Sequence, residues 1–303
     1  MTTIQSGVSV APTYSQFVDL DALEPSFAIL IDELASQPFS AEALSKALAG
    51  GVSEAAAILR AIPIQEGRLL ERGIAMIAEL NPDLAVLTQN VRLPVTKAAL
   101  ELVEKNDPKH YRSLTLDAET GGRKSYTPDL ITVNRRTKLA HVVDVKRSLG
   151  SYEVARINEL KSRMLAAALI APDLLYREHH RLVADEVRVV ILNAENQRSD
   201  IPGGVWPLGH LDHLVEVTGA GKAIGLLRER FHARINENWT QARHTLAGLK
   251  AARVPAHPSG EGASPNQGGA PDMGAGLIEE NGQPPARGHI RVGFARMPRA
   301  GAG

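Results

Sequence analysis

Residues 126–148, YTPDLITVNRRTKLAHVVDVKRS, decide the fold class of this protein. The stretch holds two runs rich in Val, Ile and Leu, residues 129–133 and 139–146, with the polar segment NRRTK between them. Aliphatic and β-branched runs that are bounded by polar residues are typical of strands, and so short a connection favours antiparallel pairing. We therefore expect a β-hairpin.

Three polar side chains of this hairpin are expected to meet. Side chains alternate between the two faces of a strand, so Asp144 and Lys146 share one face while Val143 and Val145 take the other. Antiparallel pairing brings the start of one strand beside the end of its partner, which places Asp129 near Asp144. The sequence thus predicts two carboxylates beside a lysine.

Such a site suits Mg²⁺ or Mn²⁺. Two carboxylates and the backbone carbonyl of Val145 are hard oxygen ligands that leave positions for water and a substrate phosphate. A bound metal would polarise a phosphoryl oxygen and lower the pKa of its water, while Lys146 would orient that water or offset charge on phosphorus. The reaction expected is phosphodiester hydrolysis.

Helices and a further strand are expected around the hairpin. Residues 67–80 and 96–105 have helical periodicity, and residues 111–116 form a strand-like run that completes an antiparallel meander with the hairpin. A helical pattern follows Gly150, and the valine-rich run 187–192 predicts another strand. The expected order is helix, three strands, helix, strand, which belongs to the α/β class.

The segments Pro128-Asp129 and Asp144-Val145-Lys146, with fourteen residues between them, resemble the active-site signature of the PD-(D/E)xK, or restriction-endonuclease-like, nuclease superfamily. The motif match covers residues 128–146, and a looser architectural match covers residues 65–195. The resemblance implies an αβββαβ core with a mixed sheet flanked by helices. It also implies catalytic roles for the two aspartates and the lysine, Mg²⁺ or Mn²⁺ as cofactor, and DNA as the substrate.

The resemblance further implies a catalytic glutamate from the helix before the meander. Glu71 is the first choice, because its helix is longer and more periodic. Glu66, Glu101 and Glu104 compete with it, and the shorter helix 96–105 lies closer to the first predicted strand. The position of this fourth catalytic residue is left open, with Glu71 preferred.

Basic side chains are concentrated around the motif. Residues 105–147 hold ten Lys or Arg and five Asp or Glu, whereas the whole chain has 34 of each and no net charge. Basic turns beside a phosphodiesterase site favour contact with nucleic-acid phosphates, although they are equally compatible with a solvated surface. The candidates are Arg123, Lys124, Arg135, Arg136, Lys138 and Arg147, with Arg156, Lys161 and Arg163 on the following helix.

Two other patterns are weaker. Residues 217–225, VTGAGKAIG, lack the first glycine and the hydroxyl residue of a phosphate-binding P-loop. His179, His180, His210 and His213 offer imidazoles, but no glutamate base or third ligand stands at a recognised spacing for a metal. We expect both patterns to be structural.

Residues 1–60 are expected to form a helical N-terminal extension. Within it, residues 39–62 predict a helix, a glycine turn and a second helix, with N-caps at Ser40 and Ser53. The outline resembles a helix-turn-helix, but the second helix offers only Arg60 as a long basic side chain. A packing role is therefore favoured.

The nuclease-like domain is expected over residues 61–253, and residues 254–303 are expected to be a disordered tail. Residues 255–303 contain 11 Gly and 7 Pro in 49 positions, a composition typical of chains without a packed core.

Composition excludes several function classes. The chain has no cysteine, so disulfides, thiolate nucleophiles and cysteine-bound metals are excluded. The first 17 residues do not resemble a secretory signal, and the longest apolar stretch, 164–175, is shorter than the roughly 20 residues that span a bilayer. We expect a soluble, cytoplasmic protein that binds nucleic acid and no membrane, with a homodimer left open. The rival function is a non-catalytic nucleic-acid-binding or interaction protein that retains this fold.

Overall fold

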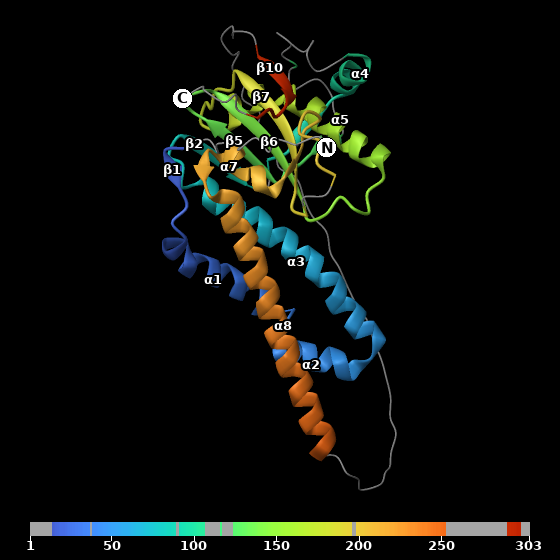
Figure 1. Ribbon diagram of the computed structural model, residues 1–303. Coiled ribbons are helices and arrows are strands. Elements are labelled where there is room, and N and C mark those ends of the chain that lie inside the picture. Colours follow the sequence, from blue (N-terminus) through green and yellow to red (C-terminus); the bar gives the residue numbers. More distant parts are fainter. Residues whose placement is uncertain are drawn as a thin grey trace, which may run out of the picture.

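The computed structural model describes residues 14–36, 38–88, 91–106, 116, 124–195, 198–252 and 290–297. These residues form an α/β body with a mixed sheet and flanking helices, from which long helices project as an arm (Figure 1). The expected α/β class with a mixed, helix-flanked sheet and a helical N-terminal region is confirmed.

The main sheet has the strand order β10-β7-β6-β5-β2, and β8 also pairs with β7. The pairs β2–β5 and β5–β6 are antiparallel, whereas β6, β8 and β10 each run parallel to the strand β7. The strands are β2 (Leu84–Thr88), β5 (Leu130–Asn134), β6 (Leu139–Lys146), β7 (Glu186–Asn193), β8 (Val205–Pro207) and β10 (Arg291–Phe294).

The predicted hairpin is confirmed, with Leu130 paired to Val143 and Asn134 paired to Leu139. The first strand of the antiparallel set is β2, which the sequence analysis missed. Residues 111–116, predicted for that place, lie outside the described residues except for Leu116. The run Leu84–Thr88 has no polar residue before its last position, so it lacks the alternation that reveals a half-exposed strand.

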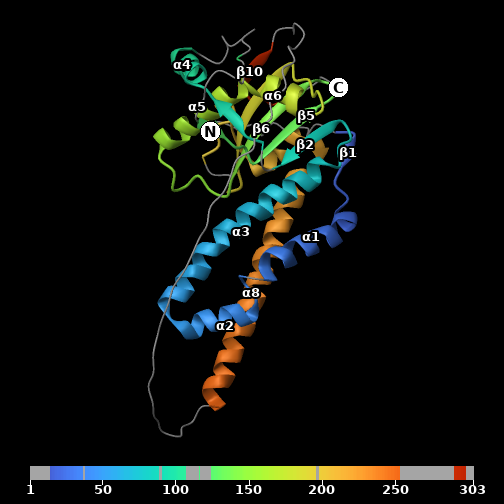
Figure 2. The same cartoon turned by 180° about the vertical axis from the view of Figure 1, so that it is seen from behind.

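Helices cover both faces of the sheet. On one face, α3 (Val52–Ala78) and α8 (Ala220–Ala252) pack against Val143 and Val145 of β6. On the other face, α5 (Val154–Ala168) and α6 (Ala171–Glu178) cover Val142 (Figure 2).

The remaining elements are α1 (Leu20–Ser36), α2 (Ala41–Gly50), α4 (Lys97–Lys105), α7 (Leu211–Val215), the 3₁₀ turn Leu208–His210, and the short strands β1 (Gln16–Phe17), β3 (Leu93–Val95), β4 (Lys124–Tyr126) and β9 (Val217–Thr218).

The arm consists of α1, α2, the N-terminal half of α3 and the C-terminal half of α8 (Figure 1). Helices α3 and α8 approach closely at Gly73, where a Cβ would lie 2.5 Å from Cδ2 of Leu227. In the described part of the chain, no helix is long and apolar enough to cross a membrane.

The N-terminal helices agree with the sequence in part. Ser40 caps α2, because its Oγ accepts a hydrogen bond from the N–H of Ala43 at 3.1 Å. Ser53 is not a cap, since α3 begins at Val52 after Gly51, whose φ is 107°. The same helix continues through Pro63 into the predicted helix 67–80, so the domain division expected at residue 60 falls inside it. Packing against α8 holds both halves in line despite the backbone hydrogen bond that proline removes.

Part of the tail is ordered, which corrects the expectation of disorder over residues 254–303. Ile290, Val292 and Ala295 are buried, and β10 pairs with β7 in parallel. Composition averaged over 49 residues concealed the short apolar segment IRVGFA at 290–295.

Candidate active site

The ends of β5 and β6 bring the two predicted carboxylates together. Because Leu130 is paired with Val143, Asp129 lies across from Asp144, and residues that face each other in an antiparallel pair share one face. The N–H of Asp129 donates to the carbonyl of Val143 at 3.1 Å, and the N–H of Val145 donates to Oδ2 of Asp129 at 2.7 Å. The side chain of Asp129 is therefore fastened to the neighbouring strand.

Asp144 is the most enclosed of these groups, with 4% of its surface exposed. Tyr126, from β4, donates its hydroxyl to Oδ2 of Asp144 at 2.8 Å, and the ammonium of Lys146 contacts Oδ1. Burial and the nearby negative charge of Asp144 raise the pKa of Tyr126 far above its usual range. Tyr126 is thus a neutral donor that orients Asp144, a role that the sequence analysis missed.

Charge is unevenly distributed at this end of the sheet. Burial and the charge of Asp144 raise the pKa of Asp129 to about 7, against the lowering effects of Lys146 and the N–H of Val145. Burial alone would lower the pKa of Lys146, but the two aspartates raise it above its ordinary value, so the ammonium stays protonated. The site therefore carries more negative charge than Lys146 neutralises, which favours a cation.

Among the four candidate glutamates, Glu71 is the one whose charge acts on Asp129, raising its pKa further. Glu101 instead forms surface ion pairs with Lys97 and Lys105, at 3.6 and 3.7 Å. Glu104 is exposed on the same helix. Glu71, the first choice from the sequence, therefore stays a prediction, supported by the effect of its charge on Asp129.

Glu66 belongs to an ion network beside the site. Its carboxylate, 2% exposed, lies 2.5 Å from Nε of Arg228, 3.3 Å from Nε2 of His232 and 3.9 Å from Nε of Arg147. Arg147 also pairs with Glu195 at 3.1 Å. The network joins α3 and α8 to the loops after β6 and β7, so Arg147, a predicted phosphate contact, is already held by two carboxylates.

The second carboxylate oxygen of Glu195 is bound by the segment that follows Lys146. The hydroxyl of Ser148 donates to Oε2 of Glu195, and Nη1 of Arg228 donates to the carbonyl of Ala194 at 3.3 Å. The sequence did not reveal the part that Glu195 and Arg228 take in this network. Each stands more than 40 residues from Lys146, and no recognised motif spacing connects it to the site.

The basic turn between β5 and β6 lies at the wrong end of the hairpin for contact with the acid pair. Five residues of extended strand, about 17 Å, separate Leu139 from Asp144. The turn residues are engaged locally, since Nη1 of Arg135 donates to the carbonyl of Pro82 at 3.4 Å, Arg136 pairs with Asp83 at 3.5 Å and Lys138 pairs with Asp185 at 3.4 Å.

Other basic candidates lie in several environments. Lys124 is exposed on β4, two residues before Tyr126, and Arg123 lies outside the described residues. The charge of Arg163 acts on Tyr126, although its guanidinium pairs with Glu159 at 2.7 Å. Arg156 stacks over Tyr152, and the ammonium of Lys161 lies 3.2 Å from Asp200.

A backbone oxygen is available beside the two aspartates as a further ligand for a divalent cation. The N–H of Val145 faces Asp129, and in a strand the carbonyl of the same residue faces the same side, so its oxygen is directed there as well. Among the described residues, those of this site included, no group of three or more His, Asp or Glu side chains is arranged to hold a metal ion. A cation would therefore draw on two carboxylates and one backbone oxygen, and would compete with Lys146 for Asp144.

The weaker patterns have structural roles. The carboxylate of Asp212 accepts the N–H groups of Gly219 and Gly221, both at 2.7 Å, so an internal anion already caps the start of α8. The hydroxyl of Tyr14 lies 2.7 Å from Nδ1 of His213.

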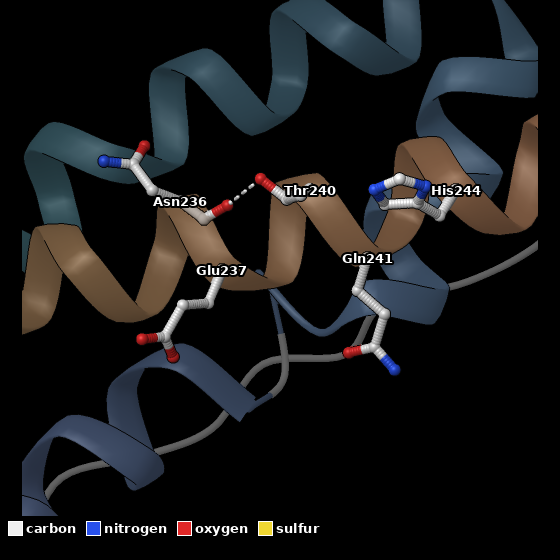
Figure 3. Close-up of a pocket in the computed structure, with 5 residues that line it drawn as sticks. All are labelled: Asn236, Glu237, Thr240, Gln241 and His244. Atoms are coloured by element: carbon white, nitrogen blue, oxygen red, sulfur yellow. Dashed lines mark hydrogen bonds between the residues drawn. The ribbon is translucent and has the colours of Figure 1, made fainter.

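A surface hollow on α8 is separate from this chemistry (Figure 3). Its five lining residues all come from α8 in the arm, where Thr240 donates its hydroxyl to the carbonyl of Asn236 at 2.9 Å. None of the predicted site residues lines it. The lining residues are Asn236, Glu237, Thr240, Gln241 and His244.

Comparison of the chain with models of known protein families, with curated proteins and with solved structures gave no match.

Proposed function

We propose that this protein is a divalent-metal-dependent nuclease that hydrolyses phosphodiester bonds in DNA. The observation that carries the proposal is the meeting of Asp129, Asp144 and Lys146 at one end of the β5–β6 hairpin, on one face of the sheet. An acid pair with a charged lysine beside it suits a phosphoryl substrate, because it combines oxygen ligands for a cation with a donor for the substrate.

The order of elements supports the same proposal. Helix α3, strands β2, β5 and β6, helix α5 and strand β7 follow one another as αβββαβ, with β3, α4 and β4 inserted after β2 and α6 inserted after α5. This order is the one that the resemblance to the PD-(D/E)xK superfamily implies.

The residues have separate tasks in the proposed reaction. Asp129, Asp144 and the carbonyl of Val145 would hold Mg²⁺ or Mn²⁺. When bound, the ion supplies polarisation of the phosphoryl oxygen and a water of lowered pKa. Lys146, which the aspartates keep protonated, donates to the attacking water or to the phosphoryl oxygen on which charge develops.

Two further residues assist. Tyr126 fixes the orientation of Asp144 through its hydroxyl. The charge of Glu71 acts on Asp129, and in the proposed reaction Glu71 accepts a proton from water.

A cleavage assay tests the proposal. Purified protein is incubated with linear, circular, single-stranded and branched DNA in Mg²⁺, Mn²⁺ or EDTA. We expect cutting that requires the metal and is lost in Asp144→Asn. Asp185→Asn is the matched control, because Asp185 is an exposed aspartate near the opposite end of the same sheet. Equal cutting by parent and Asp144→Asn would remove the basis of the proposal.

A non-catalytic DNA-binding protein is the second candidate. The observation that favours it is that both oxygens of Asp144 are engaged, by Tyr126 and Lys146, within this structure. It predicts that the parent binds labelled DNA but releases no product with either metal, and that calorimetry detects no metal binding.

A further inference from the structure

One face of α3 leads along the arm to the proposed active site. At 3.6 residues per turn, four of the residues between positions 60 and 70 lie within about 60° of the direction of Glu71 around the helix axis. We call them the α3 stripe: Arg60, Ile64, Gly67 and Arg68. Glu66, on the same turns of α3, lies 3.9 Å from Arg147, the residue after Lys146, so the stripe ends beside the end of β6 that carries the acid pair.

The α3 stripe is open to solvent. Arg60 and Arg68 are exposed, and 58% of the surface of Ile64 is exposed. A Cβ added at Gly67 would meet no atom within 4 Å. The opposite side of the helix carries the buried residues, which pack on α8 and the sheet. Among the described residues, therefore, nothing covers this face.

The charge of the stripe is not neutralised. Four of the five other arginines of α3 and α8 are paired with carboxylates, and only Arg243, near the far end of α8, is exposed without such a pair among the described residues. The pairs are Arg72 with Glu33 at 2.6 Å, Arg228 with Glu66 at 2.5 Å, Arg234 with Asp32 at 2.5 Å, and Arg230 with Glu24. Arg60 and Arg68 have no such partner in the described part of the chain, and the stripe itself contains no acid. Two uncompensated guanidinium groups on an open face complement a polyanion.

The spacing along the stripe matches a nucleic-acid strand. Arg60 and Arg68 stand about 12 Å apart along the axis, which corresponds to three or four steps of 3.4 Å in one strand. Glu71 follows about 4.5 Å further on. A strand bound by both arginines would thus run along α3 towards the end of β6, where Glu66 pairs with Arg147.

We infer that the α3 stripe binds the sugar-phosphate backbone of the DNA whose scissile bond lies at Asp129 and Asp144. This inference rests on the proposed nuclease function and adds the path of the substrate to it. Arg60 and Arg68 bind phosphates, Ile64 contacts the sugars between them, and Gly67 keeps the face flat enough for the backbone to approach.

The test is a binding experiment that does not depend on cutting. Affinity for labelled duplex and single-stranded DNA is measured by fluorescence anisotropy in EDTA over a range of salt concentrations. The variant is the double substitution Arg60→Ala, Arg68→Ala. The control is Arg181→Ala, Arg291→Ala, which removes two exposed arginines at the end of the sheet opposite the acid pair.

We expect the stripe variant to bind duplex DNA at least about tenfold more weakly at 0.1 M salt, with a salt slope shallower by about 1.8, because two phosphate contacts are lost. The control should stay within about twofold of the parent, and Arg60→Lys, Arg68→Lys should retain most of the affinity, since lysine also binds phosphate. Circular dichroism establishes that each variant folds as the parent does.

The outcomes separate the two proposals. If the parent binds DNA through the stripe but never cuts, the α3 stripe stands and the nuclease proposal fails. If the parent cuts and the stripe variant binds as well as the parent, the nuclease stands and the stripe fails. Equal weakening of variant and control also overturns the stripe, because it indicates a diffuse field. A parent that binds no DNA overturns the stripe as well.

Discussion

The N–H of Val145 donates a hydrogen bond of 2.7 Å to Oδ2 of Asp129, across the end of the β5–β6 hairpin. This bond joins the first proposed metal ligand to the segment Asp144-Val145-Lys146, which carries the second ligand and the lysine. The distance between the two aspartates is therefore set by strand pairing, and both are presented from a rigid sheet instead of a loop.

Asp144→Asn should damage metal binding. The substitution removes one negative charge from the site, so Mg²⁺ affinity measured by calorimetric titration should fall by roughly tenfold or more. Added Mn²⁺ should restore part of the cleavage, because Mn²⁺ binds a given oxygen and nitrogen site more tightly. DNA affinity in EDTA should not fall, since the mutation removes negative charge.

Lys146→Ala should damage the chemical step while metal binding is retained. Removing the ammonium deprives Asp144 of its cationic partner, so a bound metal ion no longer competes with it and calorimetric affinity should hold or rise. Single-turnover cleavage at saturating metal should slow by roughly 100- to 1,000-fold, as expected for the loss of one preorganised donor. A variant that cuts at the parental rate would assign the lysine to structure alone.

The strand β10 should stabilise the fold. Truncation after residue 289 removes Ile290, Val292 and Ala295 from buried positions, so the melting temperature should fall. The single change Ile290→Ala should cost about 2–4 kcal/mol of unfolding free energy in urea denaturation. Arg291→Ala, on an exposed side chain of the same strand, should cost little. A truncated chain with unchanged stability would mean that β10 contributes nothing to the fold.

His141 should make the protein less stable in acid. Burial, with a contribution from Arg188, lowers its pKa from 6.5 to about 3, so between these values the unfolded chain binds a proton that the native chain does not. The stabilisation is complete above pH 6.5 and is lost as the pH falls towards 3, at up to about 1.4 kcal/mol per pH unit. Asp129, whose pKa is raised to about 7, gives a dependence of opposite sign between pH 4 and 7.

Comparison of variants isolates the histidine. Urea denaturation of His141→Gln from pH 4 to 7 should show a shallower fall in stability towards acid than the parent, because the contribution of Asp129 is common to both. His244→Gln, at an exposed position on α8, should follow the parental pH dependence. Equal slopes for all three proteins would show that His141 is protonated in the native state.

The sequence by itself determined the hairpin and the composition of its acidic end. Alternation along the strand requires Asp144 and Lys146 to share a face, and the short polar segment NRRTK between two aliphatic runs favours antiparallel pairing, which places Asp129 near Asp144. These are local rules that hold whatever packs above and below the sheet. The strand at 187–192 and the helix after Gly150 were predictable for the same reason, since each carries its own periodicity.

Only the tertiary structure decided which distant residues join that end. Glu66 and Glu71 lie on one helix, and the packing of α3 against α8 turns Glu66 into the network with Arg228, whereas the charge of Glu71 acts on Asp129. The phase of a helix about its axis is fixed by the surface against which it packs, which the sequence of the helix alone does not contain. The pairing of β10 with β7 depends in the same way on a partner more than 90 residues away, because a short strand gains its stability from the sheet edge that it completes.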